Sequence, residues 1–304
     1  MNHKVNKSSS SKQNELIAAC WTTAGACSPM GDDDRSPLGI INRVEAAARA
    51  GFKGFGIRHG DLLDVETELG FRNFRTLLDE NEIKYLELEF LEGWYSQGAE
   101  RTESDKQRAD LLRAADNLGA LHIKVGGHLA GGILNLDRAS ENFFKLAEEA
   151  ESVGTRVGLE PMPFADIKTT SMGLEIVNNA GHRSGGLFID IWHVSRANID
   201  FDSLSIISAD KIVGVELDDA DTEIRGTLLE DTLNERRFPG EGDLDLNAFV
   251  KAIKSTGYNG PWGVEMLSKD FRKLPLIDAA PVSYTHLRAH ETEADIVCRL
   301  LLEK

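Results

Sequence analysis

The segment LFIDIWH at residues 187–193 decides how the rest of the chain is interpreted. It begins as an apolar run, typical of a strand buried on both faces, and then places a carboxylate and an imidazole. A charge at the end of a buried strand costs on the order of several kcal/mol unless a partner offsets it. Three more short apolar segments end in an acid, at Glu160, Glu216 and Glu265. A capped loop explains one such acid, whereas four acids separated by helical segments predict convergence on one cation.

Composition limits the class of protein. The chain has 304 residues, 41% hydrophobic and 28% charged, which suits one large α/β barrel or two ordinary domains. The formal net charge of −16 repels phosphodiester backbones and argues against a nucleic-acid partner. Three cysteines form no disulfide framework, so we expect a reducing, cytoplasmic compartment. No apolar run reaches the roughly 18 residues of a membrane span, so no membrane partner is expected.

The two ends of the chain differ in character from the middle. Residues 1–14 are polar, contain a serine run and lack the apolar segment of a secretory signal, so we predict a disordered lead-in. Residues 15–281 are predicted to form the folded domain. Residues 282–304 resemble a translated sequencing-library adapter, which would leave the domain without its native final helix. His286, His290 and Cys298 would then carry no functional weight, although a genuine final helix is the alternative.

Between these ends, short apolar segments alternate with amphipathic ones. Strands are predicted at residues 16–21, 52–57, 83–90, 121–125, 156–160, 187–190, 211–217 and 261–266. Helices are predicted at residues 38–50, 65–80, 101–118, 136–153, 170–180, 201–207 and 246–255. This alternation indicates parallel strands with crossover helices, and a closed (β/α)8 TIM barrel fits the count. A doubly wound sheet is the alternative, but no glycine-rich phosphate loop follows the first strand.

Four acids at strand ends are hard oxygen ligands, which suit Mn²⁺, Mg²⁺ or Ca²⁺ better than Zn²⁺. A divalent ion among them polarises a carbonyl or stabilises an enediolate, and flanking carboxylates move a proton between neighbouring carbons. Each acid also has a structural interpretation. Glu160 precedes a proline and is explained as a loop acid, and Asp190 as a helix cap.

Four motifs carry a family resemblance: LEPMP at 159–163, IDIWH at 189–193, RRFPGEGD at 236–243 and GPWGVE at 260–265. Together they resemble the xylose-isomerase-like sugar phosphate isomerase/epimerase superfamily, over roughly residues 16–280. The combination is specific for the superfamily and poor at naming the substrate.

The resemblance implies a TIM barrel that holds a divalent metal, commonly Mn²⁺, with Mg²⁺ as the alternative. Its ligands would be Glu160, Asp190 and Glu265, and the two glutamates would double as the proton-transfer pair. Family members usually carry a metal-binding histidine at the end of the seventh strand, where this sequence has Glu216. An anion in place of a neutral imidazole should lower the metal's Lewis acidity and favour Mn²⁺ or Mg²⁺. It also leaves open whether the reaction is the ordinary isomerisation.

Substrate contacts are expected around this ion. The resemblance implies that His193 contacts a substrate hydroxyl and that either Arg236 or Arg237 binds a substrate oxygen. Lys124, facing the barrel from the fourth strand, is a candidate electrophile or acid partner. Trp21 is a candidate for lining the sugar, although core packing explains it equally well. Weaker candidates with sound structural explanations are His59, Glu87, Glu89, Trp94, His122, His128 and Trp192.

The predicted function is a metal-dependent isomerase or epimerase of a keto-sugar or polyol derivative, acting through an enediolate. The alternative is a lyase or dehydratase of a keto-sugar, keto-inositol or keto-glycoside, which also begins by removing a proton next to a carbonyl. An apurinic-site endonuclease needs many histidines and a basic groove, which eight histidines and a charge of −16 disfavour. A non-catalytic barrel that binds a ligand through a metal is the last hypothesis. The sequence does not decide whether the protein forms a homo-oligomer. No basic cluster or glycine cradle indicates a phosphate on the substrate.

Overall fold

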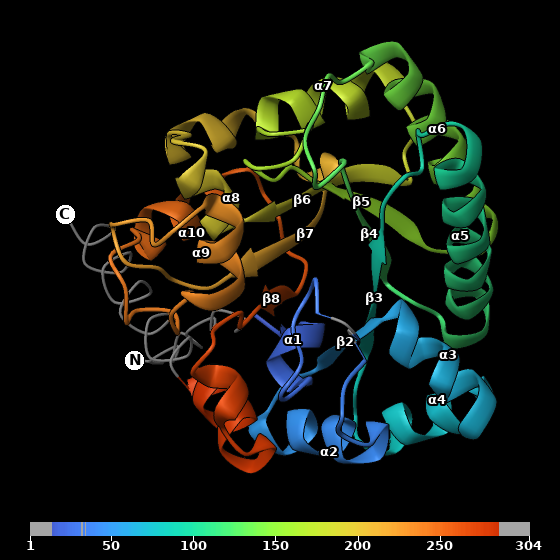
Figure 1. Cartoon of the computed structure of the whole chain (residues 1–304), viewed down its shortest axis with the longest axis vertical. Helices are drawn as coiled ribbons and strands as arrows, with labels where there is room; N and C mark the ends of the chain where they lie inside the picture. Colours follow the sequence, from blue (N-terminus) through green and yellow to red (C-terminus); the bar gives the residue numbers. More distant parts are fainter. Residues whose placement is uncertain (1–13, 32, 34, 286–304) are drawn as a thin grey trace, which may run out of the picture.

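The computed structural model describes residues 14–31, 33 and 35–285. The predictions for nearly all of the N-terminal lead-in, and for His286, His290 and Cys298, lie outside the described residues. Within them, the strands form one closed parallel barrel in sequence order, as Figure 1 shows. The strands are β1 (Leu16–Ala18), β2 (Gly54–Arg58), β3 (Tyr85–Leu91), β4 (His122–Gly126), β5 (Arg156–Glu160), β6 (Gly185–Asp190), β7 (Ile212–Leu217) and β8 (Trp262–Val264).

Closure is made by β1, which pairs in parallel with both β2 and β8. Leu16 is in register with Trp262, and Ile17 with Gly54 on the other side. The closed barrel of eight parallel strands is confirmed, and the doubly wound sheet is excluded. Because the strands are parallel, all eight carboxyl ends open at the same rim, where barrels of this class carry their active sites.

Helices surround the barrel (Figure 1). They are α1 (Cys20–Thr23), α2 (Ile40–Ala50), α3 (His59–Glu68), α4 (Phe71–Glu80), α5 (Gly98–Leu118), α6 (Leu136–Ser152), α7 (Thr170–Ala180), α8 (Ile191–Arg196), α9 (Leu228–Asn234) and α10 (Leu246–Ser255). Short 3₁₀ turns are η1 (Phe201–Ile206), η2 (Ala209–Lys211) and η3 (Phe271–Lys273). None of the described helices is long and apolar enough to cross a membrane.

The single helix predicted at residues 65–80 is wrong, because two helices occupy this region. Helix α3 ends before Leu69, and Gly70 then adopts a left-handed backbone with φ of 79° before α4 begins at Phe71. Glycine enters this conformation without the Cβ clash that other residues suffer, so the chain turns here. Gly51 caps the end of α2, with φ of 111° and its N–H bonded to the carbonyls of Ala47 and Ala48.

A helix also occupies residues 276–285, where the described residues end. It runs through residue 281, the position at which the folded domain was predicted to end. Ala280 and Ser283 are fully buried, and the ring of Tyr284 packs edge-on against Phe52 with centroids 5.2 Å apart. The described part of this helix therefore covers the barrel beside α2.

The inner face of the barrel carries charged side chains, whereas barrels of this class are usually filled with branched apolar ones. Lys124 on β4 donates to both carboxylate oxygens of Glu216 on β7, at 2.7 and 2.8 Å. The two strands are not neighbours in the closed sheet, so these side chains meet across the interior. The apolar core lies instead between the strands and the surrounding helices, where α5, for example, buries Leu111, Ala115 and Leu118 at helical spacing.

Candidate active site

The four predicted metal ligands gather at the carboxyl rim of the barrel. Glu160 and Asp190 are the last residues of β5 and β6, Glu216 is the penultimate residue of β7, and Glu265 follows β8. Asp190, Glu216 and Glu265 each place an oxygen within 4.8 Å of the others. Gly263 on β8 makes room for one of them, since a Cβ there would lie 2.5 Å from the Cγ of Glu216.

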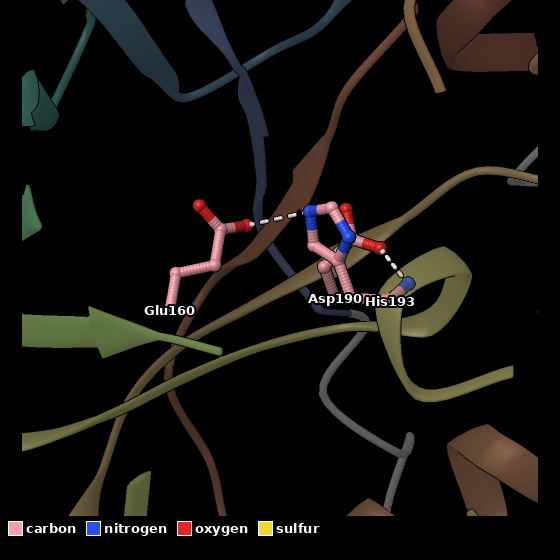
Figure 2. Close-up of side chains that lie close together, drawn as sticks. All are labelled: Glu160, Asp190 and His193. Carbon is pink, nitrogen blue, oxygen red and sulfur yellow. Dashed lines mark hydrogen bonds and ion pairs between the residues drawn. The ribbon is translucent and has the colours of Figure 1, made fainter. Parts of the chain in front are cut away.

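Glu160, Asp190 and His193 form a second group whose ligand atoms lie within 4.8 Å of one another (Figure 2). Asp190 belongs to both groups and links them, whereas Glu160 does not join Glu216 and Glu265 in one group of the described residues. The imidazole Nε2 of His193 lies 3.6 Å from Oε1 of Glu160. Burial lowers the pKa of His193 to about 3, so its ring is neutral at physiological pH.

Asp190 also performs the structural task that the sequence allowed for it. Its Oδ1 accepts the backbone N–H of His193 at 3.0 Å and so caps the start of α8. Its Oδ2 accepts from Nη1 of Arg236 at 2.7 Å. Although burial opposes its ionisation, the charge of Arg236 and the contacts of His193 hold the pKa of Asp190 below its usual range. The helix cap therefore fixes the orientation of a carboxylate that belongs to the cluster.

Of the two predicted arginines, Arg236 enters the site. Its guanidinium is 2% exposed, and its Nη1 contacts Asp190, Asp218 and Glu265, the last at 3.1 Å. Nε and Nη2 both donate to the hydroxyl of Thr232, at 3.1 and 2.9 Å.

Arg237 lies outside the cluster. Its side chain is 42% exposed and pairs with Asp221 at 2.9 Å. Its backbone N–H and C=O bond to those of Asp219, at 2.7 and 3.0 Å. The antiparallel bridge to Asp219 positions the neighbouring Arg236.

Lys124 lies beneath the acids. Besides Glu216, its Nζ approaches Glu265 at 3.3 Å and Glu89 at 3.5 Å, and it lies over the ring of Phe188. Burial alone would lower the pKa of Lys124, but these acids raise it well above its usual value. The lysine is 1% exposed and does not line the cavity above, so it organises the floor of the site.

A cavity of about 80 Å³ lies above this floor. Its polar lining comes from Arg58, Glu89, Glu160, His193, Thr232, Arg236 and Glu265. Trp21 contributes to the wall, with the guanidinium of Arg58 over its ring at 5.2 Å. The remaining wall is apolar: Pro29, Met30, Phe90, Leu129, Met162, Phe164, Leu229, Leu233 and Leu267. Three acids therefore face one small cavity with apolar sides.

The buried groups of this region carry a surplus of negative charge. Seven acids are each at most 5% exposed: Glu87, Glu89, Glu160, Asp190, Glu216, Asp218 and Glu265. The equally buried Lys124 and Arg236 are the permanent cations among them in the described residues. Burial raises the pKa of Glu160, Glu216 and Asp218 well above the usual range. The cluster is therefore short of positive charge.

Unpartnered polar atoms point to the same deficiency. Among the described residues, Oε1 of Glu160, Oδ1 of Asp218 and Nδ1 of His193 are buried without a hydrogen-bond partner. Buried polar atoms are rarely left so, and each one calls for a ligand, water or ion. Carboxylate oxygens in surplus, with open positions, fit a hard divalent cation.

Reasoning from the sequence missed part of this arrangement. Asp218 was left out of the site, although its place right after β7 was a usable signal. Glu89 was ranked below its structural explanation, although the alternation of Glu87 and Glu89 placed both on one strand face. Thr232 was also missed, although it lies four residues before Arg236, a spacing that one helical turn brings together.

Known proteins resemble this chain in sequence and in fold. The sequence profile of the xylose isomerase-like TIM barrel family matches residues 44–290. Among curated proteins, the chain is 27% identical to a 3-dehydroshikimate dehydratase of Pseudomonas aeruginosa, over 78% of this chain and 37% of that protein. It is also 27% identical to an inosose isomerase of Bacillus subtilis, over 51% of this chain and 53% of that protein. The chain thus aligns with about a third to a half of the length of these relatives.

Solved structures show the same fold. One is the IOLI protein with a bound zinc atom, with a TM-score of 0.77 and 20% identity, covering 90% of this chain and 96% of that one. Another is a D-allulose 3-epimerase from a Methylomonas species in complex with D-allulose, with a TM-score of 0.69 and 16% identity, covering 92% and 98%. At these identities the likeness concerns the fold.

Proposed function

Because the chain belongs to the xylose isomerase-like TIM barrel family, we propose that it is a divalent-metal-dependent isomerase or epimerase of a keto-sugar or keto-polyol. One observation carries the proposal: Glu160 and Glu265 reach the same cavity from different strands. Two carboxylates on different sides of a bound substrate can remove a proton from one carbon and return it to a neighbour or to the opposite face.

The residues proposed to hold the metal are Glu160, Asp190, Glu216 and Glu265. When bound, the ion supplies Lewis acidity that polarises a substrate carbonyl. An all-oxygen donor set supports Mn²⁺ or Mg²⁺ for this chain. The zinc of the IOLI protein belongs to that structure and its own ligands.

The other groups of the cavity bind and orient the substrate. The free Nδ1 of the neutral His193 suits a hydrogen bond to a substrate hydroxyl. Arg236 lines the cavity and carries a permanent charge, which suits a carbonyl or hydroxyl oxygen. Trp21 offers an apolar face for a sugar ring, and the apolar wall keeps water away from the reacting carbons. In this proposal Lys124 acts from the floor through Glu216, and Arg237 has no contact with the substrate.

The test is deuterium exchange from solvent into a panel of ketoses and inososes, with Mn²⁺ supplied and metal binding verified by calorimetry. We expect exchange at the carbon next to the carbonyl of at least one compound, and its loss in Glu265→Gln. Glu175→Gln, an exposed change on α7, is the matched control. Metal binding without exchange on any compound would contradict the proposal.

A second candidate is a dehydratase or lyase, which starts from the same proton removal. Two observations favour it: the dehydratase relatives align with 78% of this chain, and a third acid, Glu89, lines the cavity. The two reactions differ in what happens after the proton has left.

A further inference from the structure

Glu89 is the cavity-facing acid to which the isomerase mechanism gives no role. It lies on β3, is 2% exposed and lines the cavity with Glu160 and Glu265. It belongs to neither group of potential metal ligands in the described part of the chain. Its Oε1 accepts the backbone N–H of Cys20 at 3.2 Å, and its Oε2 lies 3.5 Å from Nζ of Lys124. One oxygen is thus anchored, and the carboxyl group is held in place at the wall.

An isomerase or epimerase needs acids only at the carbons whose protons move, and Glu160 and Glu265 meet this need. An elimination needs one more group, because the departing oxygen must be protonated while the C–O bond breaks. We propose that Glu89 is the general acid that protonates the leaving oxygen in a β-elimination from a keto-sugar or keto-glycoside, an inference that rests on the proposed proton removal at the same site.

The step balances without an oxidant or a further reactant. Glu160 or Glu265 takes the proton from the carbon next to the carbonyl, and that C–H pair becomes the new C=C bond. The C–O bond at the next carbon breaks with its electron pair, and the oxygen takes the proton of Glu89. The products are an enone and water, or an alcohol where the leaving oxygen carries a substituent. The enzyme has gained one proton at the base and lost one at Glu89, and exchange with solvent restores both.

The surroundings of Glu89 favour a proton donor. Burial raises the pKa of Glu89 to about 7, with Glu87 and Glu265 raising it and Lys124 and Arg58 lowering it. Oε2 of Glu87 lies 2.7 Å from Nε2 of His122, whereas its Oε1 is buried without a hydrogen-bond partner. Near neutral pH a large fraction of Glu89 therefore carries the proton that the leaving oxygen needs.

Part of the cavity wall is apolar, which favours an apolar substituent on the leaving group. Leu129, Phe164, Leu229 and Leu233 face the cavity and offer no hydrogen bond to a further sugar hydroxyl. Pockets of this kind bind an apolar substituent through buried area. The favoured substrate class is a keto-glycoside with an apolar aglycone. A keto-sugar that loses a hydroxyl group as water is the alternative.

The experiment compares leaving groups in Glu89→Gln. The probes are the methyl, phenyl and 4-nitrophenyl 3-keto-β-D-glucosides, supplied with Mn²⁺ in D₂O. Product release and deuterium at C2, the carbon between the carbonyl and the leaving group, are followed by mass spectrometry. The amide keeps an oxygen that can accept the N–H of Cys20. The exposed Glu175→Gln on α7 is the matched control, and thermal melting verifies folding.

We expect Glu89→Gln to slow methanol release about 10²- to 10⁴-fold, the range for loss of a general acid. Release of 4-nitrophenol should slow far less, because this anion leaves without a proton, and deuterium exchange at C2 should persist. Equal slowing for all three leaving groups, or none for any, would overturn the assignment of Glu89. Exchange without elimination in the wild-type protein would overturn it too and leave the isomerase intact. Absence of both exchange and elimination on the glucosides, ketoses and inososes would remove both proposals.

Discussion

Two sets of buried carboxylates in this molecule differ in how far their oxygens are hydrogen-bonded. Asp219, in the loop after β7, is fully buried, and its two oxygens accept the backbone N–H groups of Ala220, Leu244 and Gly240 at 2.8 to 3.0 Å. Glu160, at the end of β5, is 3% exposed, and its Oε1 has no hydrogen-bond partner. Fixed donors surround the acid that shapes a loop. The acid that faces the cavity keeps an oxygen that a bound ion or substrate could use.

The same contrast holds elsewhere in the chain. Asp166 accepts from the hydroxyl of Tyr95 at 2.7 Å and from the N–H of His128 at 2.8 Å, and it holds two rim loops together. Asp61 accepts from Arg43 and from the N–H of Ser36. Each of these acids has donors of its own, whereas Lys124 and Arg236 are each shared among three acids of the site. Shifted pKa values and oxygens without a hydrogen-bond partner indicate a functional site more clearly than burial alone does.

The largest expected effect is on turnover. Glu265→Gln should lower kcat about 10²- to 10⁴-fold, because the amide cannot accept a proton. Turnover is measured on whichever ketose exchanges deuterium. The exposed Glu175→Gln should leave kcat unchanged. A fully active Glu265→Gln enzyme would contradict a catalytic role for the acids of the site.

The next effect is on folding. Lys124→Met should lower the free energy of unfolding by about 3–5 kcal/mol, because it leaves Glu216 buried without its cation. Urea denaturation measures this, and Lys145→Met, on the exposed face of α6, is the control. The double variant Lys124→Met/Glu216→Gln should recover much of the loss. Equal destabilisation by Lys145→Met would show that the lysine pair with Glu216 matters little.

The third prediction concerns pH. A pKa of about 7 for Glu89 in the fold, against 4.5 for the ordinary group, means that the folded protein binds the proton more tightly. The contribution of Glu89 to the free energy of unfolding is then largest below pH 4.5 and falls as pH rises to 7. Above pH 7 it is flat, and the total change is about 3 kcal/mol. Glu89→Gln should remove this part of the pH dependence in chelator-treated protein. Parallel curves for the wild type and the variant would contradict the raised pKa.

A smaller effect is expected when the loop acid Asp219 is replaced by its amide. Asp219→Asn should lower the free energy of unfolding by about 2 kcal/mol, because an amide cannot satisfy the backbone donors on both sides. Affinity for Mn²⁺ per folded molecule, measured by calorimetry, should change little. Unaltered stability in Asp219→Asn would show that this loop acid is dispensable.

The smallest effect has the opposite sign. Glu160→Gln in chelator-treated protein at pH 8 should raise the free energy of unfolding by about 1 kcal/mol, because it removes an acid whose ionisation burial opposes, a common trade between stability and function. Affinity for Mn²⁺ should fall at the same time. If Glu160→Gln destabilised the metal-free protein as Asp219→Asn does, the two sets of acids would not differ in kind.

The strands and most of the helices were predictable because their signals are local. Apolar runs, amphipathic spacing and glycines such as Gly51 and Gly119 act within a few residues, and both glycines form left-handed helix caps in the structure. The helix predicted at residues 65–80 is divided because Gly70, inside that range, adopts a left-handed backbone. The short helices α1, α8 and α9 were not foreseen, since they are too short for a periodic pattern and depend on contacts at the rim.

The sequence by itself determined that eight parallel strands would bring Glu160, Asp190, Glu216 and Glu265 to one rim, because strand direction and alternation allow no other end. Only the tertiary structure decided which charges meet there. It placed Arg236 in the cluster and left Arg237 at the surface, and it set Lys124 beneath the cavity. These contacts join side chains from strands and loops that are far apart in the sequence. No local sequence pattern predicts which of them meet.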